Sequence, residues 1–74
     1  MDIEEFGQIK LGDVPHRVLS IFHSKSNLLL CMVEWRPRAG DEALQPLDSV
    51  VSLDYISTHH RDLLLDYYLS VIRP

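Results

Sequence analysis

The 74-residue sequence predicts an α+β domain in which a small, curved, three-stranded antiparallel sheet is packed by a C-terminal helix. Three observations predict it. Residues 14–22 and 28–35 are two strand-length segments, rich in β-branched, aromatic and aliphatic side chains, on either side of a polar turn. A third short segment of strand character follows. The last dozen residues then place apolar side chains at helical spacing.

The first half of the chain predicts an entry segment and a hairpin. Residues 1–13 form the N-terminal entry segment, and residues 14–74 form the domain on which Phe6 and Ile9 can pack. Pro15 has no N–H to give to a sheet, so it belongs at the start or edge of the first strand. The turn is at residues 24–27. The continuous apolar run 28–35 is typical of the most buried strand.

The middle of the chain leaves alternatives open. A third strand is expected within residues 42–47, where Pro46 marks an edge or a strand end. Residues 48–58 fit a loop, a short strand through 49–53, or a helical turn. Ser57 or Thr58 is expected to be the N-cap of the final helix, because its hydroxyl can accept an unpaired N–H of the first turn.

The final helix has more apolar surface than one small core can cover. At about 100° per residue its side chains form two apolar stripes and a narrow polar remainder. The stripes are Leu65, Tyr68, Leu69 and Ile72, and Leu63, Leu64, Tyr67 and Val71; the remainder is Asp62, Asp66, Ser70 and Arg73. A chain this short has little interior, so one stripe is expected to meet another chain. In the alternative, segment 48–58 covers that stripe and the protein is a monomer.

Composition excludes several function classes. The net charge of −4 with scattered Lys and Arg argues against direct nucleic-acid binding. The longest apolar run, 28–33, is far shorter than the ~20 residues of a membrane span, so no membrane partner is expected. The single Cys31 cannot form an internal disulfide, which indicates a reducing compartment.

The sequence carries no motif typical of a catalytic or metal-binding site. There is no phosphate loop or nucleophile elbow, and we expect a protein that is not an enzyme and needs no cofactor. The four histidines lack zinc-ligand spacing and are expected on the surface, with no metal bound. They are His16, His23, His59 and His60.

Three segments carry a resemblance to a known family. Residues 29–36 form an apolar strand ending in Trp35 and Arg36, residues 41–46 form an acidic turn and a following segment, and residues 63–72 combine aliphatic and paired aromatic residues. Together they resemble the chromo shadow domain, a subtype of the chromo-like fold. Leu44, where a chromodomain would have its second Trp, favours the shadow subtype.

The resemblance implies a function. Chromo shadow domains are non-catalytic interaction modules of nuclear heterochromatin and gene-silencing proteins. The resemblance implies a homodimer, or a heterodimer with another chromo shadow domain, and contacts with heterochromatin or chromatin-remodelling proteins. The implied interface residues are Leu65, Tyr68, Leu69 and Ile72.

Two alternative functions follow from the same resemblance. In one, Ser49, Val51 and Leu53 form a Val-x-Leu segment that docks onto another protein's shadow dimer by strand addition. In the other, the chain is a degenerate chromodomain that binds methyl-lysine in an aromatic cage. Trp35 would be one cage wall and Phe6 a candidate for another, but Arg38 stands where an aromatic residue belongs, and its charge would repel the ligand.

Overall fold

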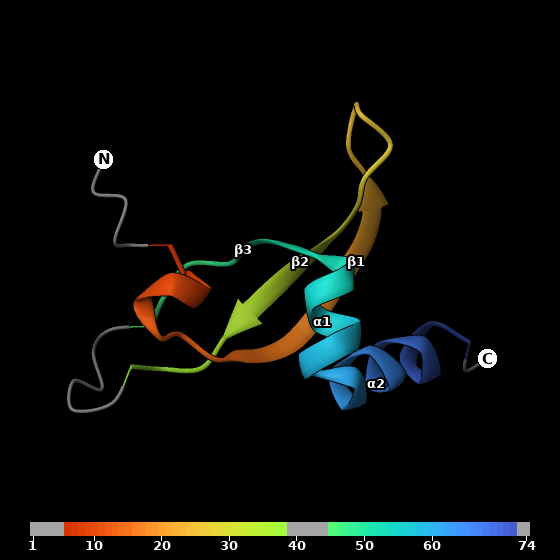
Figure 1. Cartoon of the computed structure of the whole chain (residues 1–74). Helices are drawn as coiled ribbons and strands as arrows, with labels where there is room; N and C mark the ends of the chain where they lie inside the picture. Colours follow the sequence, from red (N-terminus) through yellow and green to blue (C-terminus); the bar gives the residue numbers. More distant parts are fainter. Residues whose placement is uncertain (1–5, 39–44, 73–74) are drawn as a thin grey trace.

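The computed structural model describes residues 6–38 and 45–72, which form a three-stranded sheet and two helices (Figure 1). The strands are β1 (Pro15–His23), β2 (Leu29–Trp35) and β3 (Ser49–Ser52), and the helices are α1 (Leu53–His59) and α2 (Arg61–Ile72). A short 3₁₀ turn, Ile9–Leu11, precedes the sheet. The strand order is β1-β2-β3, and both pairings are antiparallel. The predicted α+β architecture, a small antiparallel sheet followed by a C-terminal helix, is confirmed.

The hairpin β1–β2 forms where the two apolar segments predicted it. Its turn is closed by the Ser24 N–H, which donates to the Leu28 carbonyl at 2.8 Å, and by Asn27 in the left-handed region at φ 67°. Asn tolerates this conformation better than most residues. The pairing register shifts on both sides of Arg17 and Val18, as β-bulges do, and such irregularities bend a strand. Figure 1 shows β1 as a long, curved strand.

The third strand lies later in the chain than the sequence predicted. Residues 42–44 of the expected strand lie outside the described residues, Gln45 and Pro46 belong to no strand, and Leu47 makes one isolated parallel bridge with Phe6. The strand that pairs with β2 is instead Ser49–Ser52, with Val51 opposite Cys31. Pro46 has no N–H for a ladder, whereas Val50 and Val51 favour one.

Two helices, not one, follow the sheet. Ser52 caps α1 by accepting the Tyr55 N–H on its hydroxyl at 3.1 Å, so segment 48–58 is a strand followed directly by a helix. The expected caps Ser57 and Thr58 lie inside α1, and this prediction was wrong because an earlier serine begins an earlier helix. His60 separates the helices: its carbonyl accepts the Leu63 N–H in the first turn of α2.

The core lies between one face of the sheet and the two helices. Its buried apolar side chains come from β1, β2, α1 and α2, and they are Val18, Cys31, Val33, Trp35, Ile56 and Leu64. Ile56 is completely buried, and Leu53 and Tyr55 are half-buried beside it, so one side of α1 packs on the core. Burial raises the pKa of the Cys31 thiol. Only one side of α2 packs against the core, and the side chains on its other side remain exposed to solvent.

Candidate functional site

Helix α2 is apolar on two sides, as the sequence predicted. Leu64 is buried, and Leu63 and Tyr67 are half-buried against the core. The other stripe faces solvent. Its exposed fractions are 54% for Leu65, 41% for Tyr68, 62% for Leu69 and 73% for Ile72. We call these four residues the outer row.

The outer row is continuous and points away from the domain. Leu65 and Leu69 are four residues apart, as are Tyr68 and Ile72, and residues at this spacing are neighbours on a helix surface. Leu69 lies about 140 to 160° around the helix from Leu64 and Tyr67, which face the core. A surface helix of a single domain usually places polar residues there. Segment 48–58 does not cover the row, because the four side chains are 41–73% exposed with β3 and α1 in place.

Apolar surface also continues from the end of α2 onto the sheet. Val71 is 58% exposed because its stripe extends past the edge of the core, and Leu19 of β1 is 37% exposed. Both line a groove of about 360 Å³ between α2 and β1. The other lining residues are Arg17, Val18, Asp66, Tyr67 and Ser70. The exposed apolar surface therefore begins on α2 and reaches β1.

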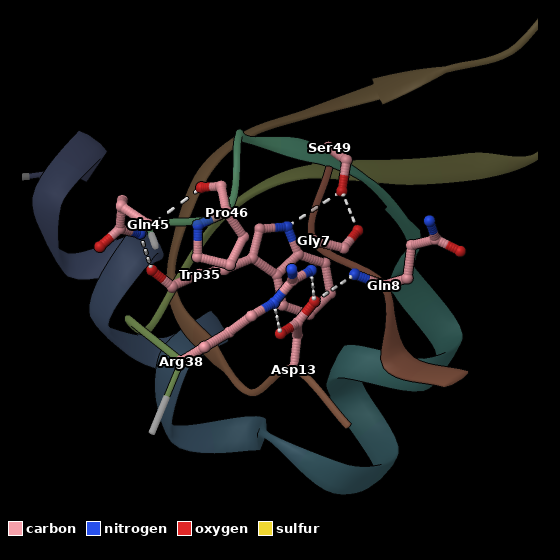
Figure 2. Close-up of polar contacts among 8 residues, drawn as sticks. All are labelled: Gly7, Gln8, Asp13, Trp35, Arg38, Gln45, Pro46 and Ser49. Carbon is pink, nitrogen blue, oxygen red and sulfur yellow. Dashed lines mark hydrogen bonds and ion pairs between the residues drawn. The ribbon is translucent and has the colours of Figure 1, made fainter. Parts of the chain in front are cut away.

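Trp35 lies at the centre of a different arrangement (Figure 2). It is 1% exposed, and its indole Nε1–H donates to the Ser49 Oγ at 2.9 Å. The Ser49 hydroxyl in turn donates to the Gly7 carbonyl at 2.6 Å, while the Gly7 N–H donates to the Leu47 carbonyl at 3.1 Å. Gly7 lies so close to the indole that a Cβ at this position would overlap the ring. The chain's own N-terminal segment therefore covers Trp35.

A buried ion pair closes the same region. The Asp13 carboxylate accepts two hydrogen bonds from the Arg38 guanidinium and one from the Gln8 N–H, each at 2.9 Å. The Asp13 side chain is 2% exposed, and the hydrogen bond from Arg38 is the main reason that its pKa is lowered from the ordinary value. This pair fastens the entry segment to the end of β2. The sequence does not predict this ion pair, because 25 positions separate the partners and no local spacing links them.

The three residues of the methyl-lysine hypothesis are all engaged in contacts within the domain. Trp35 is buried, Arg38 is paired with Asp13, and Phe6 is half-buried in its bridge with Leu47. Among residues 6–38 and 45–72, no second aromatic ring stands beside Trp35 in a ring contact. The arrangement around Trp35 therefore joins β2, β3 and the N-terminal segment rather than opening toward a ligand.

The Val-x-Leu segment is built into the fold. Ser49 holds Trp35 and Gly7, Val51 faces the core opposite Cys31, and Leu53 is the first residue of α1. Both Val51 and Leu53 are half-buried against the core, while Val50 on the other face of β3 is 46% exposed. The three predicted docking residues therefore lie at the edge of the sheet. Val51 and Leu53 pack against the core, and Ser49 is hydrogen-bonded to Trp35.

Three histidines make isolated contacts with neighbouring side chains. His59 and His60 flank the Tyr55 ring at centroid distances of 4.6 and 5.8 Å, and the Nε2 of His16 lies 3.9 Å from the Glu34 carboxylate. Within the described ranges, no three His, Cys, Asp or Glu side chains are placed to hold a metal ion. No helix in that part of the chain has the length and apolarity to cross a membrane.

No family model, curated protein or solved structure matches this chain. The candidate functional site therefore rests on the residues of this chain alone. It is the outer row of α2, whose exposed apolar side chains are not needed for packing within the domain.

Proposed function

We propose that this chain is a non-catalytic protein–protein interaction module of the chromo shadow type, which dimerises with a second copy or with another chromo shadow domain through α2. The observation that carries the proposal is the outer row, Leu65, Tyr68, Leu69 and Ile72, which is apolar, continuous and turned away from the core. A contiguous exposed apolar patch of this kind is characteristic of a protein interaction surface.

The exposure of the patch supports pairing. Five apolar side chains of α2, the outer row and Val71, are each 41–73% exposed, and each partner in a standard interface buries ~800 Å². Leu19 and the rim of the groove beside β1 can contribute further area. Tyr68 can bring an aromatic ring to the interface together with a hydroxyl at its edge.

The biological setting is proposed from the resemblance. A small antiparallel sheet with a C-terminal helix is the architecture that a chromo-like domain requires, and Trp35 ends its central strand as the family pattern implies. By this analogy the module acts in the nucleus and links a larger protein to a heterochromatin, gene-silencing or chromatin-remodelling complex.

The other two functions are less well supported. Docking of the Val-x-Leu segment requires Val51 and Leu53 to leave positions where they pack against the core. Methyl-lysine binding requires Trp35 to leave the contacts that bury it. Pairing through α2 requires no rearrangement of the described residues.

The test compares two substitutions that add the same charge. Leu69→Glu places a carboxylate in the outer row, where burial without a partner costs several kcal/mol. Thr58→Glu, at an exposed position on α1 away from the outer row and the groove, is the control. Sedimentation equilibrium is measured for each protein alone and mixed with a chromo shadow domain. We expect Leu69→Glu to abolish pairing and Thr58→Glu to retain it, with circular dichroism unchanged in both. A wild-type chain that stays monomeric alone and in the mixture would overturn the proposal.

A further inference from the structure

β1 is an edge strand, because the strand order of the sheet is β1-β2-β3. Its backbone pairs with β2 on one side, and no backbone hydrogen bond on the other side joins it to the remaining described residues. Helix α2 lies beside the first half of β1, where a groove separates Leu19 from Val71. The second half extends with the hairpin beyond both helices (Figure 1) and presents an open edge.

The register of the hairpin determines which backbone groups this edge presents. The Ser24 N–H donates to the Leu28 carbonyl at the turn. From that pair onward, residues of an antiparallel strand alternate between those that bond to the partner strand and those that point away from it. Phe22 therefore bonds to β2, whereas the N–H and C=O groups of Ile21 and His23 point to the open edge.

The open half of β1 lacks the features that normally protect a sheet edge. Proteins protect exposed edges with proline, charged side chains and β-bulges. In β1 these features lie in the first half, which contains Pro15, Arg17 and the register shifts that end at Ser20. Residues 20–23 pair in regular register and include no Pro, Lys, Arg, Asp or Glu. This stretch is therefore suited to receive a further strand.

Apolar side chains flank the open edge on both faces of the sheet. Phe22 is 37% exposed on the outer face, and Ile21 is half-buried on the core face. The groove of about 360 Å³ that Leu19 and Val71 line continues along the same edge. Because side chains of a strand alternate between the two faces, a strand added here would contact Phe22 on one face and reach the groove on the other.

We infer that the open edge of β1 is a docking site for an extended peptide segment of another protein, which adds to the sheet as a fourth strand. Backbone hydrogen bonds to Ile21 and His23 hold the segment, and its β-branched or aliphatic side chains contact Phe22 and the groove. Residues 20–23 are a short stretch that suits a peptide, whereas a standard interface between folded domains buries ~800 Å² on each partner. This surface is separate from the outer row, so the inference does not depend on the proposed function.

The probe is a synthetic decapeptide in which valine and threonine alternate, with a lysine at each end for solubility. The control peptide has the same sequence and charge but is N-methylated at every valine and threonine, so it has no N–H to donate to a sheet. Amide hydrogen exchange of the protein is followed by NMR with each peptide. At a free peptide concentration about ten times its dissociation constant, we expect the Ile21 and His23 N–H groups to exchange about tenfold more slowly. The Phe22 N–H should change less, and the control peptide should have no effect.

A pair of variants tests the same hydrogen bonds. His23→Pro removes one N–H from the open edge and no bond to β2, and His23→Ala, which keeps the N–H, is its matched control. Both should remain folded by circular dichroism, and the proline variant should bind the peptide about five- to tenfold more weakly than the alanine variant. If His23→Pro does not fold, the exchange measurement on the wild type decides.

Two results would overturn the inference. One is equal protection of Ile21 and His23 by the two peptides, or protection by neither. The other is protection of these N–H groups that rises with protein concentration in the absence of peptide, which would show that a second copy occupies the edge. Neither result bears on pairing through α2.

Discussion

Trp35 and Ser49 are joined by a hydrogen bond of 2.9 Å from the indole Nε1–H to the serine hydroxyl. The same hydroxyl donates to the Gly7 carbonyl, so one small side chain links the end of β2, the start of β3 and the N-terminal segment. Trp35 can be buried here because its one polar atom has a partner. This contact explains why the indole is part of the interior and why the strand at Ser49–Ser52 begins where it does.

Removing the Ser49 hydroxyl should destabilise the domain. In Ser49→Ala the buried indole N–H loses its acceptor and the Gly7 carbonyl loses its donor, which should lower the free energy of unfolding by about 1–3 kcal/mol. Ser49→Thr keeps a hydroxyl and should recover most of the loss. Urea denaturation of the three proteins measures this. Equal stability of the alanine and threonine variants would show that the hydroxyl is not responsible.

Acid should weaken the attachment of the entry segment through Asp13. Its pKa is lowered in the folded protein, chiefly by the hydrogen bond from Arg38, and is ordinary in the unfolded chain. The stability that this carboxylate contributes is therefore complete above its ordinary pKa and is lost as the pH falls through the lowered value. In Asp13→Asn this contribution is absent.

The measurement is the difference in unfolding free energy between wild type and Asp13→Asn as a function of pH, because other carboxylates cancel in the difference. We expect a constant advantage for wild type near neutral pH that shrinks below about pH 4. A difference that does not change with pH would show that Asp13 is not held as the anion by Arg38.

Histone-tail peptides carrying methyl-lysine should not bind measurably. Trp35 is 1% exposed, and the Arg38 guanidinium is bound by the buried Asp13 carboxylate. Each cation–π contact is worth about 0.5 to 2 kcal/mol, which does not offset the ordering of a flexible tail by one ring. Isothermal titration calorimetry should show affinity weaker than about millimolar. Micromolar binding that depends on methylation would contradict this account of Trp35.

Adjacent residues of β3 should respond differently to the same substitution. Val51→Glu places a carboxylate against the core and should unfold the domain, whereas Val50→Glu, at a 46% exposed position on the other face of the strand, should leave it folded. Circular dichroism distinguishes the two. A pull-down with a chromo shadow dimer accompanies it: a folded Val51→Glu protein that has lost capture would favour the docking hypothesis, and a folded one that retains capture would rule out both roles.

Local patterns predicted the elements whose signals are themselves local. The polar turn between two apolar segments defined the hairpin, and helical spacing at the C-terminus showed a helix with two apolar stripes. The third strand was misplaced because two short segments, residues 42–47 and 49–53, were both possible strands, although β-branched Val50 and Val51 lie only in the second. Pairing with β2 chose between them, and pairing depends on residues distant in sequence. The helix cap was also misplaced, because it depends on where the third strand ends. The strand β3 ends at Ser52, and the Ser52 hydroxyl then caps α1.

The sequence by itself determined that α2 is apolar on two sides, because the 3.6-residue period assigns each side chain to a stripe whatever surrounds the helix. The tertiary structure decided which stripe is covered: the sheet and Ile56 of α1 leave room for Leu64 and Tyr67 but none for Leu69. The tertiary structure also decided the contacts of Trp35 and Arg38. Trp35 meets Gly7 and Ser49, and Arg38 meets Asp13, only when the chain folds back on itself. Periodicity is a property of neighbouring residues, whereas burial and ion pairing depend on contacts between residues far apart in the chain.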